Sequence, residues 1–285
     1  MTENNNIHVV DNIKDMQALS NSIKKEGRII SFVPTMGALH EGHLSLMRAA
    51  KDKGDFVVVS IFVNPTQFGP DEDFNKYTRD LDGDIRKISE IGVDAVFFPD
   101  VKEIYPEGFE TYVEVEELQK PLCGQFRPGH FKGVATVVLK LFNIVKPDIA
   151  IFGEKDYQQL LVIKKMVRDL HLEVEIIAMP IIREEDGLAL SSRNAYLSNE
   201  DRARALALSE SLREIEKKYK EGNKNINDLV RLGVNILNES LINDIDYFEI
   251  RNGRSLESEK EAQPGDVVAI AAKVGNARLI DNTKL

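Results

Sequence analysis

The sequence predicts an α/β protein, with a doubly wound parallel sheet followed by a smaller C-terminal α+β domain. Up to about residue 182, apolar strand patterns alternate with amphipathic helical patterns, as expected of right-handed βαβ units. The valine-rich segment 56–63 is typical of a central strand buried on both faces. After Arg183, two helical stretches precede two strands. We therefore expect one domain over residues 1–182 and another over 183–285.

The elements of the first domain follow from the spacing of its apolar residues. They recur at helical spacing from Ile13 to Ile23, with Asp11 placed to cap this helix and Gly27 to end it. The same reasoning gives, in chain order, strand 29–33, a helix from near 42 to 54, strand 56–63, helix 82–91, strand 94–98, helix 134–145, strand 149–152, helix 156–171 and strand 174–179.

The second domain begins with helices and ends with strands. The helical stretches cover residues 199–221 and 225–243, and Ser198 with Asp201 resembles a capping box at the start of the first. Strand patterns cover 246–250 and 267–274.

The composition excludes several classes of protein. The formal net charge of −10 repels phosphate backbones, so nucleic acid is not an expected partner, and any nucleotide site must be locally basic. The single cysteine, Cys123, makes neither an internal disulfide nor a cysteine-rich zinc site. The polar N-terminus lacks a signal segment, and no apolar run approaches the ~20 residues of a membrane span. We expect a cytoplasmic protein that does not bind membranes.

The most informative motif runs from Pro34 to His43, between a predicted strand and a predicted helix. Ligands of a parallel sheet bind at the carboxyl ends of its strands, where a helix N-terminus offers N–H groups to phosphate. Gly37 and Gly42 allow close backbone approach, and His40 and His43 are placed to donate hydrogen bonds to the same phosphates. The His-x-Gly-His pattern resembles the signature of the nucleotidylyltransferase superfamily, whose members activate substrates at the α-phosphate of ATP.

Further polar residues follow two other predicted strands. Asn64 and Gln67 are neutral amides suited to hydroxyl and carboxylate oxygens. Lys155 is a point charge for phosphates that gain charge as pyrophosphate leaves. Asp156 is placed to bond a ribose hydroxyl, to cap the next helix, or both.

Consecutive hydroxyl groups and a guanidinium in the segment 186–194 predict a phosphate clamp. Ser191, Ser192 and Arg193 supply these groups, and the arginine can make bidentate contacts. This segment resembles the second phosphate-binding signature of the same superfamily.

Together, in order and spacing, these motifs resemble those of the pantoate–β-alanine ligase (pantothenate synthetase) family from about Phe32 to Asn282. The resemblance includes the segment 127–131, Arg-Pro-Gly-His-Phe, and the terminal segment 277–282. It implies a Rossmann-like first domain, a second domain that closes over it as a lid, and a homodimer.

The resemblance also implies roles for individual residues. His43, the family's proton donor, would act in catalysis with His40 and Lys155. Gln67 and Gln159 would hold pantoate, and Gln67 would also help to place β-alanine. Asn64 would bind substrate beside Gln67. ATP would be bound by Met36, Gly37, Ala38, Leu39, His40, Glu41, Gly42, His43, Gly153, Glu154, Lys155, Asp156, Ile182, Leu190, Ser191, Ser192 and Arg193. Mg²⁺ would bridge the ATP phosphates, with Asp84 as its protein contact, directly or through water.

The implied reaction is the ATP-dependent condensation of (R)-pantoate with β-alanine to pantothenate. Pantoate would attack ATP to give pantoyl adenylate and pyrophosphate, and β-alanine would then displace AMP. Two alternatives stay open: a nucleotidylyltransferase that keeps AMP on its product, and a non-catalytic nucleotide-binding or tRNA-associated module. The segments with Gln67 and Gln159 favour the ligase, and the acidic charge disfavours tRNA.

Overall fold

The computed structural model describes residues 7–70 and 72–285, which form two compact units. Unit 1 comprises the described residues up to Glu116, together with Arg127–Glu154 and Val162–Pro180. Unit 2 comprises Glu117–Phe126, Lys155–Leu161 and Ile181–Leu285. Its last segment begins beside the expected boundary at residue 182, and two short segments from earlier in the chain join it.

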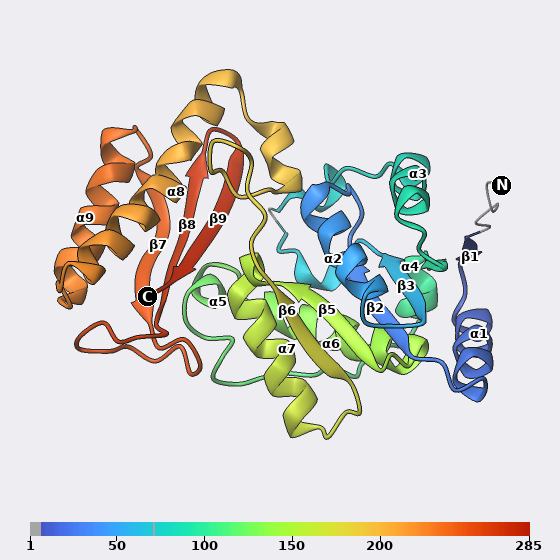
Figure 1. The fold of residues 1–285 in the computed structure, drawn as a ribbon. Helices are drawn as coiled ribbons and strands as arrows, with labels where there is room; N and C mark the ends of the chain where they lie inside the picture. The colour runs from blue at the N-terminus through green and yellow to red at the C-terminus, as the bar shows by residue number, and fades with distance from the viewer. Residues whose placement is uncertain (1–6, 71) are drawn as a thin grey trace. The chain divides into compact units, whose positions relative to one another are not determined.

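Unit 1 is built on a six-stranded sheet in the order β1-β4-β3-β2-β5-β6, and every strand pair in its described part is parallel (Figure 1). The strands are β1 (His8–Val10), β2 (Ile30–Thr35), β3 (Phe56–Ile61), β4 (Ala95–Phe97), β5 (Ile149–Gly153) and β6 (Glu175–Met179). The strand order reverses between β2 and β5, and in such folds ligands bind at the carboxyl ends of the strands at this point.

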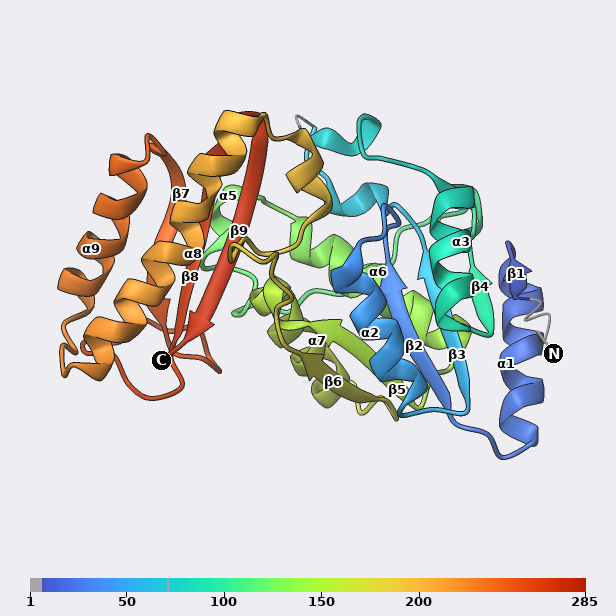
Figure 2. The ribbon, with the colours of Figure 1, turned by 45° about the horizontal axis from the view of Figure 1, so that its top comes forward.

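Helices cover both faces of this sheet, which confirms the predicted doubly wound fold. The helices are α1 (Ile13–Lys25), α2 (Glu41–Lys51), α3 (Leu81–Ile91), α4 (Val101–Ile104), α6 (His130–Val145) and α7 (Tyr157–Asp169), the last of which runs from unit 2 into unit 1. Figure 2 shows α2 and α3 in front of the sheet. Val33 of β2 packs in the cluster that contains Met47 of α2, whereas Phe32 meets Phe142 of α6 edge to face at 6.4 Å between ring centroids. Neighbouring residues of β2 therefore serve opposite faces.

Unit 2 contains a three-stranded antiparallel sheet in the order β7-β8-β9. Its strands are β7 (Asp244–Arg251), β8 (Val267–Val274) and β9 (Ala277–Lys284), and its helices include α5 (Cys123–Phe126), α8 (Asn199–Lys220) and α9 (Ile226–Glu239). Leu208 and Leu212 of α8 pack with Phe248 and Ile270 of the sheet in a core of its own. The predicted α+β character is therefore confirmed.

Some element ends differ from the predicted ones. Asn12, not Asp11, caps α1, because its side chain accepts a hydrogen bond from the N–H of Asp15 at 2.9 Å. The helix predicted from residue 134 begins at His130, after Gly129 in the left-handed region. The sequence reasoning missed the edge strand β1 and the strand β9. In the described part of the chain, no helix is long and apolar enough to cross a bilayer.

Candidate active site

The loop between β2 and α2 carries both predicted histidines at the start of a helix. His40 is the N-cap of α2, and its Nδ1 accepts from the N–H of Gly42 at 3.2 Å. The Nδ1 of His43 accepts from the N–H of His40 at 3.3 Å. An imidazole nitrogen that accepts carries no proton, so both neutral rings hold their proton on Nε2. The ring centroids lie 4.1 Å apart, so the two imidazole rings are direct neighbours.

Asp84 of α3 fixes the backbone of this loop. Its two carboxylate oxygens accept from the N–H groups of Ala38 at 2.9 Å and Leu39 at 2.8 Å. The side chain is buried, and this burial raises the pKa of Asp84 above its usual value, although the two backbone hydrogen bonds and nearby Lys87 lower it. Lys87 also donates to the carbonyl of Leu39 at 2.7 Å. The carboxylate predicted to contact Mg²⁺ is therefore already engaged with the loop.

The close approach of Asp84 requires glycine at position 37. Gly37 has a φ of 82°, and a Cβ there would lie 3.0 Å from an Asp84 oxygen and 3.1 Å from Ile61. The next residue, Ala38, also has a positive φ of 51°. The loop is held in a strained backbone conformation, which the hydrogen bonds of Asp84 and Thr35 stabilise.

After β3, Asn64 is buried and its side-chain amide makes several hydrogen bonds. Its oxygen accepts from the hydroxyls of Thr66 at 2.9 Å and Tyr105 at 2.8 Å. Its nitrogen donates to the side-chain oxygen of Gln67 at 3.0 Å and to the carbonyl of Gly133 at 3.2 Å. Burial raises the pKa of Tyr105 to about 12, so its hydroxyl stays a donor at neutral pH. Asn64 thus orients Gln67, and the predicted pair lies together.

The amide nitrogen of Gln67 approaches the first predicted loop. It lies 3.2 Å from the sulfur of Met36, so the segment after β3 reaches the segment after β2. The carboxyl ends of the neighbouring strands β2 and β3 thus bring the residue predicted to bind pantoate beside the loop predicted to bind ATP.

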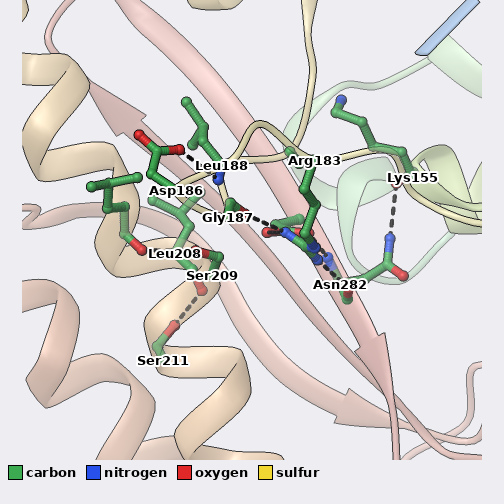
Figure 3. Close-up of polar contacts among 12 residues, drawn as sticks. Lys155, Arg183, Asp186, Gly187, Leu188, Leu208, Ser209, Ser211 and Asn282 are labelled. Atoms are coloured by element: carbon green, nitrogen blue, oxygen red, sulfur yellow. Dashed lines mark hydrogen bonds and ion pairs between the residues drawn. The ribbon is translucent and has the colours of Figure 1, made fainter. Parts of the chain in front are cut away.

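A single turn after β5 (Glu154–Asp156) contains Lys155 and Asp156, and Gln159 follows in α7. The backbone carbonyl of Lys155 accepts from the Asn282 side chain of β9 at 2.9 Å (Figure 3). Gln158, which the sequence reasoning did not select, is buried and donates to the carbonyls of Leu118 at 2.9 Å and Pro121 at 2.7 Å. Its neighbour Gln159 is half-buried.

The segment 182–190 forms a tight hairpin that leads into the predicted phosphate clamp at residues 191–193. The N–H of Leu190 donates to the carbonyl of Ile182 at 3.0 Å, so these two predicted ATP residues lie side by side. Ser191 caps the turn Ser192–Tyr196 by accepting from the N–H of Arg193 at 3.2 Å.

An ion pair with a buried carboxylate fastens this hairpin to β9. Arg183 donates to the two carboxylate oxygens of Asp281 at 2.6 and 2.9 Å. It also donates to the carbonyl of Gly187 at 3.1 Å (Figure 3). The side chain of Asp281 is only 1% exposed. The terminal segment 277–282 thus anchors both predicted segments of unit 2 that would bind ATP.

The predicted site residues are divided between the two units. Unit 1 holds residues 36–43, Asn64, Gln67, Asp84, Gly153 and Glu154, and unit 2 holds Lys155, Asp156, Gln159, Ile182 and 190–193. Among the residues that the structure describes, no group of three or more histidine, cysteine, aspartate or glutamate side chains is arranged to hold a metal ion.

The sequence of this chain matches the family model described as Pantoate-beta-alanine ligase over residues 8–284. A curated relative named pantothenate synthetase, from Pelobacter propionicus, is 50% identical over 279 residues, which is 98% of each chain. Another of that name, from Pseudothermotoga lettingae, is 53% identical over 277 residues, covering 97% of this chain and 98% of the relative.

Solved structures of the same name share the fold. The crystal structure of pantothenate synthetase from Thermus thermophilus has a TM-score of 0.92 at 44% identity, covering 98% of this chain and 99% of that one. The pantoate-beta-alanine ligase from Francisella tularensis, complexed with beta-gamma ATP and beta-alanine, has a TM-score of 0.82 at 39% identity, covering 98% and 97%.

Proposed function

This chain belongs to the pantoate–β-alanine ligase family and is an ATP-dependent ligase that joins pantoate to β-alanine, and we propose that it works through a pantoyl adenylate. A carboxylate oxygen of pantoate attacks the α-phosphorus of ATP, and the bond to the leaving pyrophosphate breaks. The amine of β-alanine then attacks the activated carbonyl, loses a proton and displaces AMP. No side chain becomes a covalent nucleophile.

The observation that carries this proposal is the pair of Nε2–H groups at the N-terminus of α2. Because His40 and His43 use Nδ1 to accept from backbone N–H groups, each neutral ring carries its proton on Nε2. Preorganised donors at a helix N-terminus favour phosphate oxygens that gain charge as pyrophosphate leaves. We assign both histidines to the phosphates of ATP, with His43 as the catalytic donor.

We assign the groups of unit 2 to the same nucleotide. Lys155 and Arg193 supply positive charge, and Ser191 and Ser192 supply hydroxyls. Asp156 is assigned to the ribose. Their support is that β9 anchors both segments, through Asn282 and Asp281. Gln67 and Gln159 are assigned to pantoate, with β-alanine beside Gln67.

Magnesium fits this chain as part of MgATP. Its preferred ligands are oxygens, and it commonly keeps several waters while binding phosphates and one or two carboxylates. Asp84 has both oxygens engaged with loop N–H groups, so we assign it an outer contact with Mg²⁺ through water. The ion would neutralise phosphate charge. We also assign the chain to the cytoplasm as a homodimer.

Pantoate-dependent isotope exchange tests the proposal directly. With ATP, Mg²⁺ and labelled pyrophosphate, but without β-alanine, we expect label to enter ATP only when pantoate is present. Free AMP should appear only after β-alanine is added. Exchange that does not need pantoate, or a product that keeps AMP after amine addition, would favour a nucleotidylyltransferase and overturn the assignment.

A further inference from the structure

The segment Arg127-Pro-Gly-His-Phe131 received no role from the sequence, yet it lies against the backbone of Gln67. The Nδ1 of His130 lies 2.8 Å from the carbonyl oxygen of Gln67, and the guanidinium of Arg127 donates to the same oxygen at 3.2 Å. One carbonyl oxygen has two lone pairs, so these two donors satisfy it fully. Its position is therefore fixed from two directions.

The contacts of His130 determine its tautomer. A carbonyl oxygen only accepts, so Nδ1 must carry the proton. Its Nε2 lies 3.2 Å from Nη1 of Arg127, and a guanidinium only donates, so Nε2 must accept. His130 is therefore neutral, with its proton on Nδ1, the opposite arrangement to that of His40 and His43.

Glu72 in turn holds the guanidinium of Arg127. Nε and Nη2 of Arg127 donate to the two carboxylate oxygens at 2.7 and 2.5 Å. Burial raises the pKa of Glu72, but the hydrogen bonds and charge of Arg127 outweigh this effect, so its pKa lies below the usual value. The carboxylate is ionised at neutral pH, and bidentate pairing leaves the guanidinium little freedom to turn.

A glycine in α6 brings the helix close enough for these contacts. A Cβ on Gly133 would lie 2.4 Å from the carbonyl oxygen of Thr66 and 2.7 Å from the nitrogen of Gln67. The carbonyl of Gly133 also accepts from the side chain of Asn64. The first turn of α6 thus packs directly on the backbone of the segment 64–67.

We propose that Arg127 and His130 are positioning residues for Gln67. They fix its carbonyl, and through it the backbone from which its amide reaches toward Met36. This inference rests on the proposed function, because it takes Gln67 to be the pantoate residue. Arg127 and His130 themselves touch no substrate in this proposal. Their loss should weaken pantoate binding and leave ATP binding intact.

Two substitutions of His130 separate the roles of its ring nitrogens. In His130→Asn the amide nitrogen takes the place of Nδ1 and can still donate to the Gln67 carbonyl. In His130→Gln the amide extends toward the place of Nε2 instead. We expect His130→Gln to raise KM for pantoate about tenfold, as expected for one lost positioning hydrogen bond, with KM for ATP within about twofold of wild type. His130→Asn should raise KM for pantoate no more than about threefold.

Further variants keep the test decisive. Arg127→Lys keeps the positive charge beside Glu72, but an ammonium cannot donate to Glu72, His130 and Gln67 at the same time. Like His130→Gln, it should therefore raise KM for pantoate and leave KM for ATP unchanged. This variant tests the proposal even if one histidine variant folds poorly. Lys132→Ala, on the same turn of α6 but directed at the ring of Tyr112, should leave both KM values unchanged. Thermal unfolding of each variant shows whether it is folded.

The outcomes distinguish this inference from the proposed function. Equal pantoate KM values in His130→Asn and His130→Gln, or parallel rises in KM for pantoate and ATP, would refute the positioning role while leaving the ligase assignment intact. A wild-type protein that forms no pantothenate would instead refute the proposed function itself.

Discussion

Three histidines of unit 1 hold their protons on different nitrogens, and this determines what each can do. His40 and His43 accept at Nδ1 and therefore donate from Nε2. His130 donates from Nδ1 to a backbone carbonyl. His40 and His43 therefore carry the Nε2–H groups, and we propose that these two residues bind the phosphates of the nucleotide.

Removing the donor of His43 should slow the reaction strongly. His43→Ala is expected to lower turnover by about 10²–10³, the usual effect of deleting one preorganised donor to a developing negative charge. Lys155→Ala should have an effect of similar size. His43→Gln retains an N–H near the position of Nε2 and should lose less. Steady-state rates of folded variants measure this, and near-normal turnover in His43→Ala would contradict its role.

We expect the main role of Asp84 to be holding the backbone of the loop between β2 and α2, and its contact with Mg²⁺ to be secondary. In Asp84→Asn one oxygen becomes an NH₂ group, which leaves the N–H of Ala38 or Leu39 facing a donor. We expect the free energy of unfolding to fall by about 1–3 kcal/mol and turnover to fall at every Mg²⁺ concentration.

The exposed neighbour Asp82 provides a control for this change. Asp82→Asn, in the same turn of α3, should change the unfolding free energy by less than about 0.5 kcal/mol. Denaturant titration measures both variants. If Asp84→Asn left stability unchanged and only raised the Mg²⁺ concentration needed for half-maximal rate, direct metal binding would be the better account.

At the scale of elements, β9 holds the two segments of unit 2 that we assign to ATP. Asp281 binds Arg183 of the hairpin, and Asn282, the next residue, binds the backbone of Lys155 (Figure 3). One strand thus fixes two segments that lie far apart in the sequence.

Substituting Asn282 should therefore weaken ATP use without removing any group assigned to ATP. Asn282→Asp replaces the donor with a carboxylate that faces the Lys155 carbonyl, so we expect kcat/KM for ATP to fall about tenfold or more. Lys273→Ala, an exposed change on β8, should have no effect. Initial rates at varied ATP measure the difference, and an unchanged kcat/KM in Asn282→Asp would show that the anchor is dispensable.

The sequence predicted elements well where their periodicity was strong. Continuous apolar runs gave β2, β3 and β5, and the spacing of apolar residues gave α3 and α8 almost to their ends. It missed β9, where polar Asp281 and Asn282 interrupt the apolar pattern because both make tertiary hydrogen bonds. It also began α6 late, although the isolated Gly133 inside a helical pattern was a signal of close packing.

The motifs predicted which loops carry the candidate site, but not how those loops are held. Two examples depend on contacts between residues far apart in the sequence. Asp84 accepts hydrogen bonds from Ala38 and Leu39, and Gln158, not Gln159, binds the segment 117–126. The spacing of residues within one element does not indicate which distant residue each side chain will contact. These hydrogen bonds form only when the elements pack together.

At the scale of the whole molecule, each unit has a hydrophobic core of its own. Unit 2 also includes residues 117–126 and 155–161, which come from the first part of the chain. Gln158 joins these two short segments through hydrogen bonds to the backbone of Leu118, Pro121 and Cys123. A prediction that divides the chain at one position cannot describe a unit built from separate segments of the chain.

We expect the chain to be a homodimer, as the family resemblance implies. Light scattering after size exclusion should give twice the mass of one chain across a wide range of protein concentration. A symmetric dimer is also the commonest closed oligomer. A single-chain mass at micromolar concentration would contradict this expectation.

The bond from Asn282 to Lys155 spans 127 positions, which has a consequence for synthesis on the ribosome. At about 5–20 residues added per second, roughly 6–25 s separate the translation of these two residues. The loop with His40 and His43 is held by Asp84, which is translated much earlier. In a nascent chain, the residues that hold the loop with His40 and His43 are therefore present long before the anchor of Lys155. We expect the chain to have no ligase activity until Asn282 has been translated.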